Sequence, residues 1–285
     1  MDMVGIIGAF GTEGGGKRGM FMTISVLMLG IVILSMVFLL SEQLNMSKVS
    51  ASEIGEIDRT AGIYSNVEDG ISRIISFYIN ISVQNGTLTM EAPLPFPGRM
   101  SEDLERFSQF EAGHGEKNIS LDIENAKNGS FIVNPGGIAV SARGNVLAIA
   151  PQDSNESSGS VGSYYVDLTF LPGEIHSANW SVVSSSSGDL IPVHVRAHDP
   201  NYAVIIDIYN DIDRNGTSVL LINDGANGTG ITVVQFSDPS ALRVEGGGAI
   251  GLKTIVGFNN LVSIGANDTI SVWSTVNKTG PVKIS

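Results

Sequence analysis

Three oxygen-bearing residues in the second half of the sequence have the spacing of a metal-binding loop. Asp211, Asp213 and Asn215 alternate along the chain and are followed by Gly216. This order matches the first half of a calcium loop, in which alternate side-chain oxygens and a turn-forming glycine surround the ion. The twelfth position of such a loop is Ile222 here, in place of a bidentate glutamate. We therefore interpret Asn215-Gly216 as a hairpin turn and keep Asp211, Asp213 and Asn215 as a weak calcium candidate.

Two further patterns lack a residue that their chemistry needs. Residues 11–17 fit the first seven positions of a phosphate-binding loop, but Arg18 replaces the Ser or Thr that binds Mg²⁺. His194 and His198 alternate with apolar residues, as in a strand, where positions four apart are separated by roughly 13 Å and cannot share a metal ion. The sequence has no serine nucleophile elbow. We therefore expect a protein without catalytic residues or a cofactor, and read residues 194–198 as a polar strand face.

Many asparagines begin an Asn-x-Ser/Thr triplet, the acceptor for N-linked sugars in exported chains. Eleven of the 20 asparagines are in this context, several times more than the Ser and Thr content would give by chance, and all follow residue 40. Asn45 lies close to the apolar run described next, so we do not expect it to be modified. The predicted glycosylation sites, which should mark the surface, are Asn80, Asn85, Asn118, Asn128, Asn155, Asn179, Asn215, Asn227, Asn267 and Asn277.

Residues Met20–Leu40 form a run of 21 residues without a charge. As a helix this run is about 31 Å long, which is enough to cross a bilayer core of about 30 Å. Lys17 and Arg18 precede the run and Glu42 follows it, and basic residues flanking a span stay cytoplasmic. We predict a leader or cytoplasmic tail over residues 1–19, a membrane helix over 20–40, and an extracellular remainder.

The charge balance of the predicted outer part excludes some partners. Removing Lys17, Arg18, Asp2 and Glu13 from the totals of 16 basic and 29 acidic residues leaves 14 basic and 27 acidic residues, so the net charge of −13 lies beyond the run. Nucleic acid needs a basic surface, and we therefore expect no nucleic-acid partner. The sequence has no cysteine, which excludes disulfides and thiolate metal sites.

Residues 41–78 predict a continuation of the helix, with an apolar stripe that packs against the outer domain or another subunit. Residues 79–116 predict a hairpin around Asn85-Gly86 and then a short helix that is capped by Ser101 and ends near His114. The stripe consists of Ile54, Ile57, Ala61, Tyr64, Ile71, Ile75 and Tyr78, interrupted at Glu68.

Residues 117–285 contain fourteen short apolar runs, spaced by turns, with no helical pattern between them. Such spacing is typical of an antiparallel β-sandwich. A boundary near residues 175–185 would divide this region into two β-units. The predicted fold class is therefore mainly β, with an N-terminal transmembrane helix that continues into an amphipathic helix and an extracellular sandwich domain.

The segment Lys17-Arg18-Gly19-Met20-Phe21, which leads directly into a long apolar helix, resembles the class III leader of archaeal type IV pilin-like proteins. The resemblance covers about residues 15–45. It implies cleavage by a prepilin peptidase after Gly19, so that Met20 becomes the mature N-terminus, and a filament assembled through the N-terminal helix. Ile24 stands where bacterial pilins have Glu, and the head is larger than in many simple pilins.

The sequence therefore predicts a non-enzymatic cell-surface protein, either a pilin-like subunit or a pilin-like anchored glycoprotein that acts in filament assembly or adhesion. Its expected partners are the membrane, the peptidase and other copies of itself. The alternative is a singly anchored extracellular module that binds carbohydrate or a partner in the surface layer.

Overall fold

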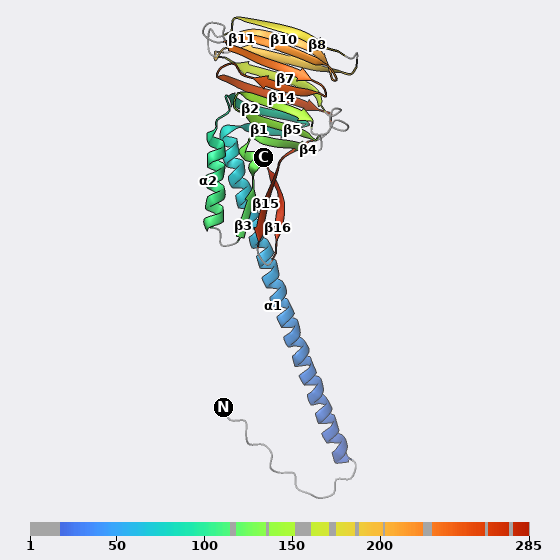
Figure 1. Ribbon diagram of the computed structural model, residues 1–285. Helices are drawn as coiled ribbons and strands as arrows, with labels where there is room; N and C mark the ends of the chain where they lie inside the picture. The colour runs from blue at the N-terminus through green and yellow to red at the C-terminus, as the bar shows by residue number, and fades with distance from the viewer. Residues whose placement is uncertain are drawn as a thin grey trace. The chain divides into compact units, whose positions relative to one another are not determined.

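The computed structural model describes residues 18–114, 118–134, 137–151, 161–170, 175–185, 188–201, 203–224, 230–259, 262–273 and 276–284 (Figure 1). The chain divides into two compact units, residues 1–58 and 59–285. One long helix contributes to both units, and the second unit is mainly β. The prediction of a mainly β protein with a long apolar N-terminal helix is confirmed.

Helix α1 (Arg18–Tyr78) contains the predicted apolar run and its predicted continuation in one element. Every side chain between Met28 and Met46 is exposed. Among the described residues, the stretch Met28–Tyr78 holds the one helix that is long and apolar enough to cross a membrane, and none of its most apolar 18-residue window is buried. The large apolar side chains of this part of α1 therefore have no protein partner within the described chain.

The predicted stripe on α1 is buried only within the second unit. Tyr64, Ile71 and Ile75 belong to the hydrophobic core, whereas Ile54 and Ile57 are exposed. At Glu68, where the predicted stripe is interrupted, the buried residue is the neighbouring Val67. An α-helix has 3.6 residues per turn, so its buried face drifts slowly relative to a pattern of alternating three- and four-residue steps.

The segment after α1 folds as the predicted hairpin and helix. Strands β1 (Asn80–Gln84) and β2 (Thr87–Leu94) pair around Asn85 and Gly86, whose φ angles of 50° and 73° are those of a tight hairpin turn. Helix α2 (Arg99–His114) ends where the sequence predicts. The predicted cap at Ser101 is wrong, because the helix already begins at Arg99. In its first turn, the N–H of the buried Met100 donates to the carbonyl of Pro97.

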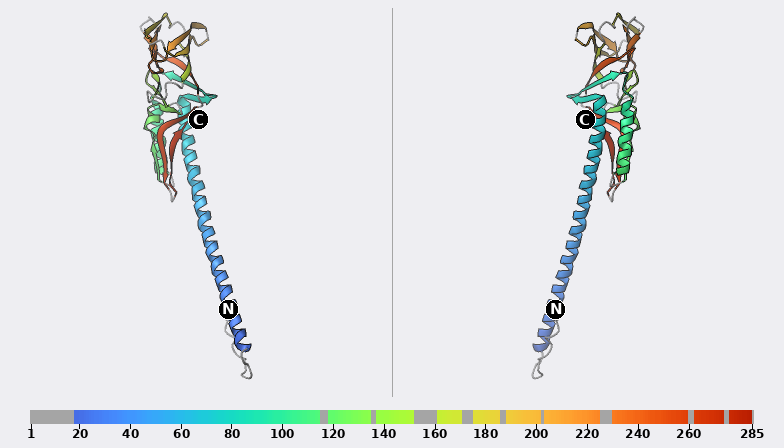
Figure 2. Two further views of the ribbon diagram at one scale, coloured as in Figure 1. Left: turned by 90° about the vertical axis from the view of Figure 1, so that its right-hand side faces the viewer. Right: turned by 90° about the vertical axis from the view of Figure 1, so that its left-hand side faces the viewer.

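Helix α2 lies alongside the C-terminal part of α1 (Figure 2). Gly70 permits this approach, because a Cβ atom at that position would lie 2.5 Å from Cζ of Phe107. The hydroxyl of Tyr78 donates a hydrogen bond to Asp103 on α2. Gly70, which costs helix propensity relative to alanine, therefore gives close packing between the two helices.

Six strands form sheet A, in the order β1-β2-β14-β7-β9-β10. All neighbours are antiparallel except β7 and β9, which are parallel. The expectation of a purely antiparallel arrangement is therefore wrong for this pair, because the chain leaves sheet A after β7, adds β8 to the other sheet, and returns in the same direction. The strands not yet bounded are β7 (Val161–Thr169), β9 (Leu190–His198), β10 (Val204–Asp213) and β14 (Ile250–Phe258).

Ten strands form sheet B, in the order β16-β15-β4-β5-β6-β13-β12-β11-β8, with β3 also paired to β15. All fourteen strands predicted after residue 117 overlap an observed strand in one of the two sheets. The strands of sheet B are β3 (Asn118–Asp122), β4 (Ser130–Asn134), β5 (Ile138–Arg143), β6 (Val146–Pro151), β8 (Ser177–Ser184), β11 (Thr217–Asp224), β12 (Gly230–Ser237), β13 (Ala241–Glu245), β15 (Ser263–Trp273) and β16 (Lys278–Lys283).

A four-residue helix, α3 (Glu124–Lys127), interrupts the chain between β3 and β4 and was not predicted. The buried carboxylate of Asp268, on β15, accepts hydrogen bonds from the backbone N–H groups of Asn125 (3.1 Å) and Ala126 (2.6 Å). Burial raises the pKa of Asp268, and these two hydrogen bonds act in the opposite direction. One side chain from a distant strand thus satisfies donors that a helix start leaves open.

The two sheets contribute to one hydrophobic core. Tyr164 on β7 contacts Phe236 on β12, with ring centroids 5.5 Å apart. Its hydroxyl donates to the carbonyl of Ser240, next to β13, at 2.5 Å, and burial strongly raises the pKa of Tyr164. Arg214, in the link between β10 and β11, donates to the carbonyl of Val161 at 2.9 Å. Residues of both sheets are therefore connected through apolar and polar contacts.

Strand β16 lies against α1 (Figure 1). The hydroxyl of Tyr64 donates to the carbonyl of Pro281 at 2.9 Å, and the ammonium of Lys278 lies 4.4 Å from the centroid of the Tyr64 ring. The backbone N–H of Lys283 donates to a carboxylate oxygen of Glu68 at 3.2 Å. Glu68, which interrupts the predicted stripe, therefore holds the C-terminal strand.

Candidate functional site on sheet A

A row of polar side chains crosses all six strands of sheet A, on the face opposite its buried residues. The strands place one residue each in register, because side chains on a strand alternate between its two faces. The charged members alternate in sign along the row, and each charged residue on an inner strand has an opposite charge as a cross-strand neighbour. This polar row consists of Asn80, Glu91, Lys253, Asp167, Arg196 and Asp207.

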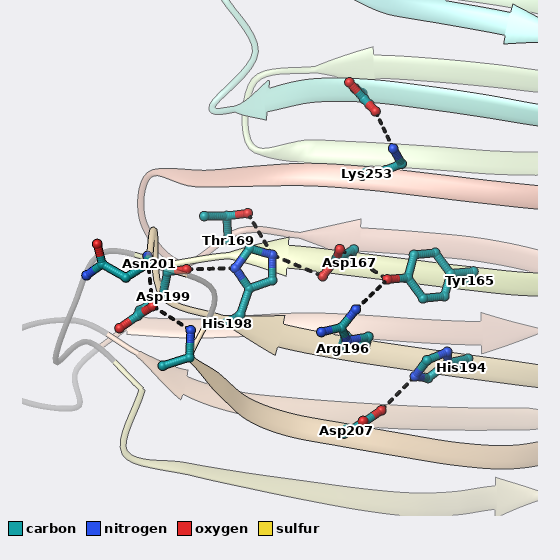
Figure 3. Close-up of polar contacts among 12 residues, drawn as sticks. Tyr165, Asp167, Thr169, His194, Arg196, His198, Asp199, Asn201, Asp207 and Lys253 are labelled. Carbon is teal, nitrogen blue, oxygen red and sulfur yellow. Dashed lines mark hydrogen bonds and ion pairs between the residues drawn. The ribbon is translucent and has the colours of Figure 1, made fainter.

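Ion pairs join neighbouring strands within and beside this row. The ammonium of Lys253 lies 2.6 Å from a carboxylate oxygen of Glu91. Hydrogen bonding between them lowers the pKa of Glu91 and raises the pKa of Lys253. Asp207 contacts Nε2 of His194 at 2.6 Å (Figure 3). Both contacts join neighbouring strands across the polar face.

Asp167 lies near the centre of the row, and its two carboxylate oxygens contact different side chains. Its Oδ2 accepts a hydrogen bond from the hydroxyl of Tyr165 at 3.1 Å, and that hydroxyl accepts from Arg196 at 3.4 Å (Figure 3). Burial raises the pKa of Tyr165. The other oxygen, Oδ1, is buried and lies 3.3 Å from Nε2 of His198 (Figure 3).

His198 lies next to this oxygen and its hydrogen bonds define its tautomer. Nδ1 is 2.7 Å from the carbonyl of Asp199, which can only accept, so Nδ1 carries the proton. Nε2 lies 3.3 Å from the hydroxyl oxygen of Thr169. Oδ1 of Asp167 is also 3.3 Å from Nε2, within reach of an ion pair.

A groove of about 570 Å³ lies beside Asp167, between sheet A and the C-terminal end of α1. Phe77 is 83% exposed at this groove, and its ring packs edge-to-face against Tyr78 with centroids 5.2 Å apart. We call it the Phe77 groove. Its lining consists of Ser76, Phe77, Tyr78, Asn80, Glu91, Ala92, Pro93, Asp167, Thr169, His198, Gly251, Leu252 and Lys253.

A second hollow, of about 480 Å³, lies on the neighbouring part of the same sheet, at β7, β9 and β10. Tyr209 is 73% exposed there and stacks on His194, with centroids 3.8 Å apart and planes 17° apart. Tyr165 contacts the same His194 ring at 4.9 Å. Exposed rings next to carboxylates, amides and hydroxyls combine an apolar surface with hydrogen-bonding groups, which suits a ligand that has both kinds of surface.

The residues predicted for leader processing lie at the start of the described chain. Arg18, Gly19 and Met20 form the first turn of α1, and Lys17 lies outside the described residues. Cleavage after Gly19 stays a prediction.

The predicted glycosylation sites lie on the surface wherever their side chains are described. Asn118 begins β3, and Asn155 and Asn227 lie outside the described residues. Modification itself stays a prediction. The exposed asparagines are Asn80, Asn85, Asn128, Asn179, Asn215, Asn267 and Asn277, together with Asn45.

The two aspartates of the calcium candidate differ in burial. Asp211 is exposed, whereas Asp213 is buried and accepts hydrogen bonds from the N–H of Asn215 (3.0 Å), the N–H of Gly188 (3.4 Å) and the hydroxyl of Ser185 (3.3 Å). The interpretation of Asn215-Gly216 as a hairpin turn is wrong, because the chain passes there from β10 in sheet A to β11 in sheet B. Asp213 organises that crossing.

The sequence indicated only part of this site. The alternation over residues 194–198 predicted a polar strand face, and β9 confirms it. Asp167, Lys253 and Phe77 were not singled out, because their neighbours lie on other strands and become adjacent only through sheet register.

Within the described residues, no group of three or more His, Asp or Glu residues could hold a metal ion. No family model, curated protein or solved structure matches this chain.

Proposed function

We propose that this chain is a non-enzymatic cell-surface protein of the pilin-like kind, anchored by α1 and carrying a β-rich head outside the cell. In this proposal the two sheets of the head pack as a sandwich, the N-terminus is cytoplasmic, and the predicted acceptor asparagines carry sugars. The host would be archaeal, as the resemblance at residues 17–21 implies.

The observation that carries the proposal is the exposed apolar surface of α1. Every side chain from Met28 to Met46 is exposed, and most of them are large and apolar. Such a surface is stable only in lipid or against other apolar helices. The same helix continues into the core of the head, where Ile71 and Ile75 are fully buried. One element can therefore anchor the head to a membrane or, with sister helices in place of lipid, to a filament.

Mass spectrometry of the protein from its own cells tests the leader. We expect the mature chain to begin at Met20. A Gly19→Val variant should remain uncleaved, whereas Gly30→Val, a matched change further along α1 where a Cβ meets no neighbour, should be cleaved normally. An intact residue 1–19 segment in the native protein would refute processing.

Protease treatment of intact cells tests the anchor and its orientation. We expect the head to be digested from outside while the membrane helix stays protected. Electron microscopy of the same cells distinguishes a filament from single anchors. A head that is fully protected, or a chain recovered from cytosol without detergent, would refute the surface assignment.

A second function, an anchored binding module, is favoured by one specific observation. The polar face of sheet A carries two hollows with exposed aromatic rings, which a purely structural subunit does not need. Filament assembly and ligand binding are compatible, because they use different parts of the chain. Cells that display the protein without filaments would favour the binding module alone.

A further inference from the structure

The described residues contain three Asn-Gly pairs, a sequence at which a chain can modify itself without an enzyme. In this reaction the backbone nitrogen of the glycine attacks the side-chain amide of the asparagine, and glycine leaves the approach open because it has no Cβ. The pairs begin at Asn85, Asn128 and Asn215, and all three asparagines are exposed. Since exposure does not separate them, the hydrogen bonds of each pair decide which one can react.

The pair at Asn128 is held by two hydrogen bonds. The N–H of Gly129, which carries the attacking nitrogen, donates to the carbonyl of Ala126 at 2.9 Å. Nδ2 of Asn128 donates to the carbonyl of Glu124 at 2.8 Å. The glycine is also enclosed, because a Cβ at this position would overlap the carbonyl oxygen of Ala142. The two reacting groups therefore cannot turn toward each other without breaking these bonds.

The pair at Asn215 is held in a similar way. The N–H of Gly216 donates to the carbonyl of Asp213 at 3.0 Å, and the N–H of Asn215 donates to Oδ1 of Asp213 at 3.0 Å. A Cβ at Gly216 would lie 2.6 Å from the carbonyl oxygen of Ser184. This turn therefore has little room to change its conformation.

The pair at Asn85 lacks these restraints. Among the described residues, neither the side-chain amide of Asn85 nor the N–H of Gly86 has a hydrogen-bond partner. The carbonyl of Gly86 accepts a hydrogen bond from the N–H of Phe258 at 2.8 Å. That bond does not involve the peptide plane between Asn85 and Gly86, so this plane is free to rotate.

The hairpin turn between β1 and β2 allows the ring of the intermediate to close. Its φ angles of 50° at Asn85 and 73° at Gly86 are those of a type I′ turn. Rotating the peptide plane between the two residues gives a type II′ turn, which also closes a two-residue hairpin. The first central residue then has ψ of about −120°, which places the next backbone nitrogen beside Cβ, as a five-membered ring requires. Glycine accepts either sign of φ, so the strands can stay paired.

We propose that Asn85 is a site of spontaneous deamidation, which the folded hairpin selects from the three described Asn-Gly pairs. The backbone nitrogen of Gly86 forms a bond to Cγ of Asn85, the Cγ–Nδ2 bond breaks, and ammonia leaves with the proton of the Gly86 N–H. Water then opens the succinimide ring. Cleavage of the new N–Cγ bond gives aspartate, and cleavage of the original peptide bond gives isoaspartate, whose main chain runs through Cβ.

The modification changes the hairpin and competes with a sugar. Both products add a negative charge at the turn, and isoaspartate also adds a backbone carbon to a two-residue loop. Asn85 begins an acceptor triplet, and deamidation consumes the nitrogen to which a sugar would be attached, so the two modifications exclude each other. The inference goes beyond the proposed function, because the reaction requires neither a glycan nor a membrane.

Peptide mapping by mass spectrometry tests the proposal. The full chain is produced in a host that adds no N-glycans, kept in detergent and sampled during incubation in mildly alkaline buffer. We expect Asn85 to lose its amide at least about fivefold faster than Asn128 or Asn215, because each of those pairs must first break a hydrogen bond of the attacking N–H. The same incubation in urea is the control, and there the three rates should converge because the fold no longer restrains any pair.

A variant that loosens one of the held pairs provides a second test. Asp268→Ala removes the carboxylate that accepts the N–H groups of Asn125 and Ala126 in α3. It should speed deamidation at Asn128, whose restraining bonds end on this helix, and leave the rate at Asn85 unchanged. Circular dichroism establishes that the head of the variant is folded.

Two results would overturn the proposal. In the folded chain, Asn85 could keep its amide as long as Asn128 and Asn215 do, which would show that the hairpin selects nothing. Alternatively, the faster loss at Asn85 could persist unchanged in urea, which would assign the selection to local sequence instead of the fold. An unchanged rate at Asn128 in folded Asp268→Ala would refute protection by the hydrogen bonds of that pair.

Discussion

Replacing Ile71 by alanine should destabilise the head strongly, whereas the same change at Ile57 should not. Ile71 is fully buried on α1, and Ile57, four turns earlier on the same predicted stripe, is 48% exposed. Ile71→Ala removes three buried carbon atoms, which corresponds to about 2.4 kcal/mol of transfer free energy. The cavity that remains adds to this loss, and the measured range for such changes is about 2–5 kcal/mol.

Urea unfolding of the full chain in detergent, followed by tryptophan fluorescence, measures this difference. Trp180 reports on the head, because its ring stacks on Phe236 with centroids 5.9 Å apart. With a slope of roughly 2–3 kcal/mol per molar urea, the midpoint of Ile71→Ala should fall by about 1 M. Ile57→Ala should shift the free energy of unfolding by less than about 0.5 kcal/mol. Equal shifts for both variants would refute the conclusion that the stripe is buried only within the second unit.

Three further changes test other contacts. Tyr164→Phe should lower the free energy of unfolding by about 1–2 kcal/mol, because the carbonyl of Ser240 loses its buried donor, and a change below about 0.3 kcal/mol would argue against this contact between the sheets. Asp268→Ala should speed hydrogen exchange of the backbone amides at the start of α3 and cost about 1–3 kcal/mol; unchanged exchange there would contradict the capping role. Lys253→Met should raise the pKa of Glu91 toward its usual value in an NMR titration. The lowered pKa means that ionised Glu91 stabilises the fold above its unfolded pKa, and that this contribution is lost as pH falls through its folded pKa. The stability difference between wild type and variant should therefore disappear at low pH. At neutral pH it should be small, as expected for exposed groups.

The local elements were predictable because each depends on neighbouring residues. The apolar run and the stripe identified α1, and Asn85-Gly86 identified the hairpin. The helix α3 was missed because four residues show no periodicity, and its stabilising partner, Asp268, is more than 140 positions away. Likewise, Ser101 had the right residue type for a cap, but the helix starts two residues earlier, at Arg99.

Features that depend on long-range pairing were not predictable. Asn215-Gly216 is typical of a hairpin, yet this turn joins strands of different sheets, because nothing local to the dipeptide specifies which strand comes next to β10. The parallel pairing of β7 with β9 depends on the same choice. The candidate site follows from it directly, since Asp167 meets Arg196 only through that parallel register.

The contact between Tyr64 and Pro281 spans 217 positions in the sequence. During synthesis, the hydrogen bond from Tyr64 can therefore form only after almost the whole head has been made. Contacts between residues so far apart in the sequence slow folding. Until then, Tyr64 on the apolar stripe of α1 lacks the strand that it contacts. A chain that ended before residue 281 would therefore lack this contact between α1 and β16.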